Sequence, residues 1–278
     1  MADSDTFQLF TSLRYDPALL AVPSLSLPRA GWNSTHSSPL YMLSYHRDRM
    51  LLAATHWGWD AAITTLQGNS GLATLADAIL SATGSTPDVP RRVRVAITRA
   101  GALSVATGPA APTPLANLFP PHLPPPSDET EESQSQDSPS KTPAWEVLLD
   151  SGRTARSEYT HFKTTVRAAY DGARQRRGIA LPDQKEVLIV NEADGVVMEG
   201  SITTPYFWRG GRWVTPAVSK EFSREGGSGG QNGTSRRWAL ERGVAVEETV
   251  LAESLVDGEE CWLSNGVRGF FFARVKLN

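Results

Sequence analysis

Apolar residues in the N-terminal part alternate with polar ones in some stretches and recur at helical spacing in others. Phe7, Leu9 and Thr11 in TFQLFTSLRYD follow the two-residue period of a strand, and the run RRVRVAITRAG follows it again. Residues 41–59 carry apolar side chains along one side of a predicted helix. The run LATLADAILSATG predicts a second helix, which ends at Gly84.

The C-terminal part shows the same two patterns with clearer turn signals. Residues 164–177 have the spacing of a helix that Gly178 closes. The β-rich runs KEVLIVN and GVVME are joined by EADG, which predicts a hairpin, and TPYFWRGGRWVTP predicts a second hairpin that turns at Gly210 and Gly211. SRRWALERG predicts a short helix, and VAVEETVL and ECWLSN predict further strands.

Residues 109–143 interrupt this patterned sequence with a run of prolines followed by serine, glutamate, aspartate and glutamine. Such a segment has few groups to bury and cannot offset the entropy of ordering, so we expect a mobile insert or linker. It separates an N-terminal domain, residues 1–108, from a C-terminal domain, residues 144–278. In a second stretch, SREGGSGGQNG, we expect either mobility or glycines that allow close backbone approach to a ligand.

Composition narrows the class of protein. The chain has 278 residues, 40% of them hydrophobic, which is enough for one large or two ordinary domains. A formal charge of −3 gives no reason to expect nucleic acid as a partner. The single cysteine, Cys261, excludes an intrachain disulfide framework, and the five histidines show no metal-binding spacing, so no metal site is expected. There is no apolar run of membrane-spanning length, and the acidic N-terminus lacks the features of a signal peptide, so we expect a cytoplasmic protein.

Lys163 and Glu199 are a candidate chemical pair. We expect Lys163 at the start of a helix and Glu199, in MEGSIT, at the end of a strand. An amine and a carboxylate delivered from two separate elements suit a pyridoxal phosphate site, because the amine condenses with the aldehyde and the carboxylate keeps the ring nitrogen protonated. Taken alone, Lys163 would be a solvated lysine on a helix surface, and Glu199 an ordinary polar residue at a strand end.

The order of FKTT, MEGSIT, the glycine-rich stretch and LSNGVRG resembles that of the class IV, or fold type IV, pyridoxal phosphate enzymes. The resemblance implies a two-domain α/β (α+β) fold like that of D-amino acid aminotransferase, with pyridoxal 5′-phosphate between the domains, and a homodimer. It implies that Lys163 holds the cofactor and that its freed amine is the catalytic acid and base. It also implies that Glu199 contacts the ring nitrogen. Thr203 and Thr204 stand near an asparagine that is frequent in the family.

The resemblance further implies a site for the cofactor phosphate. Gly233, Thr234 and Ser235 open the predicted helix SRRWALERG, where unpaired N–H groups and the helix dipole favour an anion. The alternative is a flexible loop with Thr234 or Ser235 as a plain N-cap. A P-loop is disfavoured because the Gly-Lys-Ser/Thr ending is absent. Arg49, in YHRDRML, matches the family arginine that pairs with the phosphate, and Arg47 is its rival.

Ser264 and Asn265, in LSNGVRG, resemble a segment of the 4-amino-4-deoxychorismate lyases, whereas the family's aminotransferases usually carry a Gly-Thr segment there. In that interpretation the two residues hold the cofactor phosphate or a substrate carboxylate. The alternative is a strand-to-turn junction, since Asn-Gly is a common turn signal. Arg14, in FTSLRYD, and Arg99, in AITRAG, are candidates for binding the substrate's carboxylates.

Within the family, the chain is most similar to these lyases. The similarity implies a small-molecule substrate and the conversion of 4-amino-4-deoxychorismate to 4-aminobenzoate and pyruvate, a step toward folate. The alternative is a class IV aminotransferase acting on branched-chain, D-amino acid or amine substrates. A second alternative is a catalytically idle relative kept as a binding subunit, against which the intact Lys163 and Glu199 argue.

Overall fold

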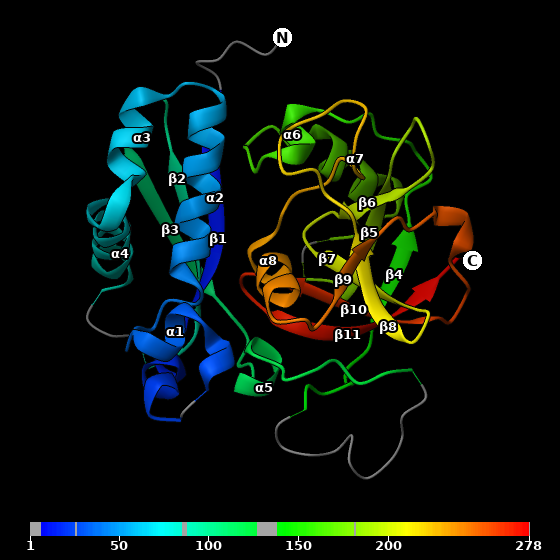
Figure 1. Ribbon diagram of the computed structural model, residues 1–278, viewed down its shortest axis with the longest axis horizontal. Coiled ribbons are helices and arrows are strands. Elements are labelled where there is room, and N and C mark those ends of the chain that lie inside the picture. Colours follow the sequence, from blue (N-terminus) through cyan, green and yellow to red (C-terminus); the bar gives the residue numbers. More distant parts are fainter. Residues whose placement is uncertain (1–6, 26, 85–87, 127–137, 181, 278) are drawn as a thin grey trace. The chain divides into compact units, whose positions relative to one another are not determined.

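The computed structural model describes residues 7–25, 27–84, 88–126, 138–180 and 182–277 (Figure 1). The chain divides into two compact units, whose limits differ from the predicted domain boundaries because the chain returns to the first unit twice after residue 144. Unit 1 consists of Met1–Leu115, Phe162–Val166 and Gly266–Arg268, and unit 2 of Ala116–His161, Arg167–Asn265 and Gly269–Asn278.

Unit 1 contains a three-stranded antiparallel sheet in the order β1-β2-β3. Strands β1 and β2 were predicted, whereas β3 was not, because its residues are mostly half-buried or exposed and carry little apolar alternation. On β2 the buried side chains alternate with exposed arginines, as the sequence pattern requires. The strands are β1 (Leu9–Tyr15), β2 (Arg91–Ile97) and β3 (Leu103–Pro109).

Helices of unit 1 lie against this sheet, α2 against β1 and α4 against β3. Helix α2 buries Leu43, Met50, Ala53 and Ala54, which confirms the predicted apolar side. Helix α4 ends where predicted, with Gly84 at a φ of 75° that favours glycine. The helical segments are η1 (Pro17–Leu25), η2 (Pro28–Ala30), α1 (Trp32–Thr35), α2 (Leu43–His56), α3 (Asp60–Leu66) and α4 (Gly68–Thr83).

Unit 2 is built on a mixed sheet of eight strands in the order β6-β5-β4-β11-β10-β7-β8-β9. The sheet curls until its β6 edge meets the segment after β9, where Val197 N donates to Val250 O at 2.8 Å and Val196 forms a bridge with Leu251. The curl encloses an apolar core to which most of the strands contribute. The strands are β4 (Trp145–Leu149), β5 (Lys185–Val190), β6 (Val197–Gly200), β7 (Thr204–Arg209), β8 (Arg212–Pro216), β9 (Val246–Glu248), β10 (Glu260–Asn265) and β11 (Gly269–Lys276).

Both predicted hairpins are confirmed. Strands β5 and β6 pair antiparallel, and β7 and β8 pair antiparallel across Gly210 and Gly211, which both have positive φ. The helical segments of unit 2 are α6 (Glu158–His161), α7 (Ala168–Arg176), α8 (Thr234–Glu241) and η4 (Ala252–Ser254), while α5 (Leu115–Leu118) begins at the last residue of unit 1. No described helix is long and apolar enough to cross a membrane.

The prediction of a helix over residues 164–177 is wrong at its start, because α7 begins only at Ala168. Lys163 therefore does not open a helix. It lies in an extended segment that pairs with β1, where Phe10 N donates to Lys163 O at 3.1 Å and Thr165 N donates to Gln8 O at 2.9 Å. Helical periodicity could not reveal this pairing, because the two partners are far apart in the sequence.

Part of the predicted mobile insert is packed. Residues 127–137 lie outside the described residues, so the prediction is untouched there. In the described part, Leu118, Phe119 and Leu123 are buried, and Trp213 Nε1 donates to Leu123 O at 2.8 Å. The correction has a simple cause: LANLFPPHL supplies apolar side chains that the proline-rich composition obscured.

Candidate functional site

In unit 1, the lysine segment is fixed by its backbone pairing with β1. The Lys163 side chain is half-buried, and its ammonium nitrogen lies 5.1 Å from the centre of the Phe10 ring. A cation at that distance is attracted by the face of the ring. Strand β1 thus sets the position of Lys163 through both main chain and side chain.

Arg49 extends from α2 toward the same strand. Its Nη2 donates to Thr11 Oγ1 at 2.6 Å, and Thr11 Oγ1 lies 2.6 Å from His46 Nδ1. A guanidinium can only donate, so the Thr11 hydroxyl accepts from Arg49. Arg47, the rival, contacts Asp48 and the Leu66 carbonyl instead. Of the two arginines, Arg49 is therefore the one that contacts β1, the strand that Lys163 also contacts.

His46 is fully buried and neutral. Burial, together with the positive charges of Arg49 and Lys163, holds the pKa of His46 well below its usual value of 6.5. The other ring nitrogen of His46, Nε2, has no hydrogen-bond partner among the described residues. A Cβ at Gly266 would lie 2.5 Å from His46 Cε1, so the turn after Asn265 requires a glycine there.

In unit 2, the Glu199 carboxylate is buried at the end of β6 and fixed by two donors. Its Oε1 accepts from the Tyr170 hydroxyl at 2.5 Å and from Gln231 N at 3.3 Å. Gln231 Nε2 in turn donates to the Tyr170 oxygen at 3.1 Å. Burial and the Glu199 carboxylate raise the pKa of Tyr170 well above 10, so the phenol remains a hydrogen donor.

The glycine-rich stretch brings Gln231 to Glu199 by passing close to β6. A Cβ at Gly230 would lie 2.5 Å from Met198 O, and one at Gly229 would lie 2.6 Å from Arg156 Cγ. Ser228 Oγ donates to Met198 O at 3.3 Å. The sequence predicted either mobility or close backbone approach to a ligand for this stretch. Its glycines do allow close backbone approach, but to strand β6 of the protein itself.

Helix α8 presents hydroxyl groups at its N-terminus. Gly233 is the N-cap residue and makes no side-chain cap, so the prediction that Thr234 or Ser235 caps the helix is wrong. Ser235 Oγ lies 2.8 Å from Ser264 Oγ, which lies 2.9 Å from the Tyr206 hydroxyl. Thr234 Oγ1 is buried and has no hydrogen-bond partner in the part of the chain that the structure describes. An unpaired hydroxyl beside the free N–H groups of a helix suits an anion.

Ser264 and Asn265 end β10, and the structure places Ser264 with Ser235. The Asn265 amide donates to Ile202 O at 3.4 Å. In unit 2, the structure thus brings Ser264 next to the α8 N-terminus and joins Asn265 to the chain that follows Glu199. Both features depend on strand order, which places β10 beside β7.

Arg14 and Arg99 are in different surroundings from those expected of substrate-binding residues. Arg14 is 1% exposed and donates to Asp16 at 2.7 Å, to Val267 O at 3.2 Å and to Ala111 O at 2.9 Å. The Arg14 guanidinium thus donates to three protein groups. We therefore interpret Arg14 as a structural residue rather than a substrate-binding one. Arg99 is exposed in the turn between β2 and β3.

Tyr170 and Gln231 are the residues near Glu199 that the sequence did not reveal. Tyr170 fits the apolar stripe of its helix, so its hydroxyl carried no separate signal. Gln231 contributes its backbone N–H, which any residue except proline would supply. Only the hydrogen-bond geometry identifies them.

Comparison with known proteins gives three findings. The family model described as Amino-transferase class IV matches residues 35–274. The aminodeoxychorismate lyase of Saccharomyces cerevisiae is 32% identical over 148 residues, and this match covers 48% of the present chain but only 37% of the yeast protein.

Solved structures share the fold over almost the whole chain. A Mesorhizobium loti protein, provisionally assigned as an amino-acid aminotransferase, superposes with a TM-score of 0.63 at 20% identity, covering 97% of this chain and 99% of that one. A Haemophilus somnus protein, provisionally assigned as a 4-amino-4-deoxychorismate lyase, gives a TM-score of 0.55 at 16% identity, covering 95% and 98%. At these identities the structural likeness shows the fold alone.

Proposed function

Because the chain belongs to the class IV aminotransferase family, we propose that it is an aminodeoxychorismate lyase that converts 4-amino-4-deoxychorismate to 4-aminobenzoate and pyruvate. The observation that carries the proposal is the 32% identity to the yeast lyase. The match spans little more than a third of that relative, so the activity of the whole yeast protein comes to this chain as a proposal only. The segment LSNGVRG, which ends β10, supports the same choice.

Family membership confirms two predictions made from the sequence. The fold is that of the fold type IV enzymes, with α/β structure in two units. The cofactor is pyridoxal 5′-phosphate, on which this family depends.

The residues present fit this cofactor. We assign its phosphate to Gly233, Thr234 and Ser235 at the N-terminus of α8, where the buried Thr234 hydroxyl has no hydrogen-bond partner among the described residues. Arg49 would add a positive charge to the phosphate. We assign the ring nitrogen to Glu199, whose carboxylate Tyr170 and Gln231 hold in place. Ser264 and Asn265 would complete the phosphate and carboxylate contacts.

The bound cofactor would supply an electron sink for the carbon that bears the substrate amine. The amine of Lys163 would take the proton from that carbon, and the neighbouring carbon–oxygen bond would then break. The enolpyruvyl group leaves and becomes pyruvate on taking up a proton, while the ring that remains is aromatic. Glu199 would accept a hydrogen bond from the protonated ring nitrogen, and the Tyr170 hydroxyl, which donates to Glu199 Oε1, would hold the carboxylate in its ionised form and in place.

The test of the proposal is incubation of the purified protein with 4-amino-4-deoxychorismate, without any keto acid, while 4-aminobenzoate fluorescence is followed. The lyase forms product without an amino acceptor. A Lys163→Ala variant should lose at least about 1,000-fold in rate, since it lacks the acid–base amine. Lys220→Ala, which changes an exposed lysine, is the matched control and should keep the wild-type rate.

A class IV aminotransferase is the second candidate. The observation that favours it is the family model itself, which is described as Amino-transferase class IV and matches residues 35–274. In that case 4-aminobenzoate would not form, and the protein would exchange an amino group once a donor and a keto acid were supplied.

We also propose that the protein is a homodimer, as the family resemblance implies. Light scattering during size-exclusion chromatography measures the mass directly. A particle of about twice the 30.1 kDa chain mass is expected, and a particle of one chain mass would contradict this proposal.

A further inference from the structure

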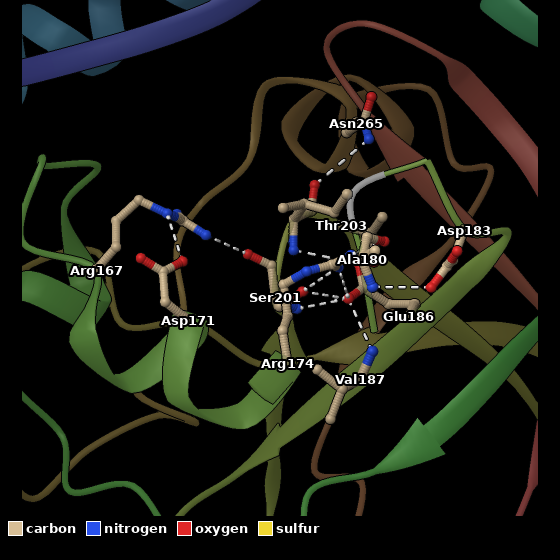
Figure 2. A network of polar contacts seen from close by, with 11 residues as sticks. Arg167, Asp171, Arg174, Ala180, Asp183, Glu186, Val187, Ser201, Thr203 and Asn265 are labelled. Atoms are coloured by element: carbon tan, nitrogen blue, oxygen red, sulfur yellow. Dashed lines mark hydrogen bonds and ion pairs between the residues drawn. The ribbon is translucent and has the colours of Figure 1, made fainter. Parts of the chain in front are cut away.

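Four residues that follow Glu199 make a tight corner between β6 and β7. This β6–β7 corner consists of Gly200, Ser201, Ile202 and Thr203. Figure 2 shows Ser201 and Thr203 of the corner together with Glu186. Gly200 N donates to Thr203 O at 2.9 Å, which closes the corner on itself. A Cβ at Gly200 would lie 2.3 Å from Thr203 Oγ1, so the corner cannot be this tight with another residue there.

A buried carboxylate from β5 binds the inside of this corner. Glu186 is 0% exposed, and its Oε1 accepts from Ser201 Oγ at 2.5 Å and Ser201 N at 3.0 Å. Its Oε2 accepts from Thr203 Oγ1 at 2.8 Å and Ile202 N at 3.2 Å. Three consecutive corner residues therefore direct their donors at one side chain. Their positions are fixed together rather than one at a time.

Arg174 supplies the opposing charge and connects the corner to α7. Its Nη1 lies 3.8 Å from Glu186 Oε1 and donates to Ser201 Oγ at 3.1 Å. Tyr170, the donor to Glu199, lies four residues earlier on the same helix, and residues at this spacing share one helix face. One face of α7 therefore holds both the Glu199 carboxylate and the corner that follows it.

The corner and the residue after it lie against two other parts of the proposed cofactor site in unit 2. Ile202 O accepts from the Asn265 amide at 3.4 Å. Thr204, the first residue of β7, lies close to Gly233: a Cβ added to Gly233 would be only 3.0 Å from the Thr204 hydroxyl oxygen. A shift of the corner would thus reach Glu199, Asn265 and the N-cap of α8.

We propose that Glu186 is a positioning residue that sets the geometry of Glu199 through the β6–β7 corner. The inference rests on the proposed contact between Glu199 and the cofactor ring. Glu186 does not touch the cofactor and acts through the corner residues alone. A buried ion pair is weak evidence for stability, because apolar residues of the same volume often replace it without loss. The many donors aimed at Glu186 instead indicate a requirement for one geometry.

The experiment compares Glu186→Gln with Asp150→Asn. Asp150 is a matched control: it is 3% exposed and accepts from Arg176, which is on α7 as well, at 2.8 and 2.7 Å. Two quantities are measured for each purified variant. These are the dissociation constant for pyridoxal phosphate and the pH dependence of the bound cofactor's absorbance. Thermal unfolding reports any loss of stability separately.

For Glu186→Gln we expect the dissociation constant to rise about tenfold and the midpoint of the absorbance titration to move, because a misplaced Glu199 no longer fits the ring. Asp150→Asn should unfold at lower temperature and keep both cofactor quantities within about twofold of the wild type. If Glu186→Gln also changes only the unfolding temperature, Glu186 is structural and the proposal is overturned.

Thr203→Val provides the second variant if Glu186→Gln does not fold. It has nearly the same shape and removes a single donor to Glu186. A weaker change in the same direction, about threefold in the dissociation constant, supports the proposal. Unchanged cofactor binding and an unchanged titration in folded Thr203→Val overturn it. None of these measurements uses a substrate, so the result is the same for a lyase or an aminotransferase.

Discussion

Tyr170 donates its hydroxyl hydrogen to Glu199 across 2.5 Å, and both residues are buried. Neither of them is an unusual residue for its element, a tyrosine on a helix and a glutamate on a strand. Their chemical significance comes from the pairing, because a hydroxyl donor whose pKa is raised holds the Glu199 carboxylate in one position.

Replacing Tyr170 by phenylalanine should weaken cofactor-dependent catalysis. The variant keeps the ring packing and removes one of the donors to Glu199, so kcat should fall about tenfold with a smaller change in KM. The folded state should lose about 1–2 kcal/mol, because the buried carboxylate is left less satisfied. Steady-state kinetics and urea unfolding measure the two effects. An unchanged kcat would show that the hydrogen bond has no catalytic role.

Thr234→Val should change stability and cofactor binding in opposite directions. The protein without cofactor should gain about 1 kcal/mol, because the variant removes a buried hydroxyl that has no partner in the described chain. Pyridoxal phosphate should bind about fivefold more weakly, because the phosphate loses a donor.

Thr215→Val is the matched control for Thr234→Val. Thr215 is also fully buried, and its hydroxyl likewise has no partner among the described residues, but it lies on β8. The control should be stabilised by a similar amount and should bind the cofactor as the wild type does. Weaker binding in both variants would mean that Thr234 has no special relation to the phosphate.

His46 should make the protein less stable in mild acid. Its pKa in the folded protein lies below that in the unfolded chain, so the unfolded chain takes up a proton first as the pH falls. The stability is complete above the unfolded pKa of about 6.5 and is lost below it, at up to about 1.4 kcal/mol per pH unit for one proton, until the folded pKa is reached.

A His46→Asn variant checks this pH dependence. Asparagine cannot titrate, and its side-chain amide can still form a hydrogen bond with Thr11 as donor or acceptor. Urea unfolding at pH 7.5, 6.5 and 5.5 should show a shallower fall in unfolding free energy for the variant, smaller by about one proton. The other histidines are the same in both proteins, so identical slopes would assign the effect elsewhere.

Gly230→Ala should damage the approach of the glycine-rich stretch to β6. The added Cβ would lie 2.5 Å from Met198 O, so the loop must move and the Gln231 N–H must leave Glu199. We expect a loss of about 1–3 kcal/mol in unfolding free energy and a lower affinity for the cofactor. Gly226→Ala is the control in the same stretch, because its nearest contact would be an ordinary 3.4 Å to Ser219 Oγ. Equal effects of the two substitutions would contradict the argument.

Features set by neighbouring residues were predictable from the sequence. The β7–β8 hairpin follows from two glycines between alternating strands, and α2 follows from its apolar side. The sequence analysis did not identify β11, although its aromatic residues favour a strand and it pairs antiparallel with the neighbouring β10. Its parallel pairing with β4, which joins Ala273 to Trp145, could not be read from any local pattern. The extended segment around Lys163 was misjudged for the same reason, as its partner is Leu9.

The same distinction between local and long-range features applies to the candidate site. Lys163 and Glu199 could be proposed from their residue types and order, and their cofactor from the resemblance. What surrounds Glu199 could not, because Glu186 looks like any polar residue at the start of a strand, and its role depends on a corner formed fifteen residues later.

Unit 1 is completed by two short stretches that come later in the chain: Phe162–Val166, which follows the first segment of unit 2, and Gly266–Arg268, which follows most of unit 2. The Lys163 backbone adds to β1, and Gly266 O accepts from Arg14 N at 2.9 Å. The first 115 residues alone therefore lack two of the segments that belong to this unit. Exchanging unit 1 between relatives would require three separate segments of the chain rather than one.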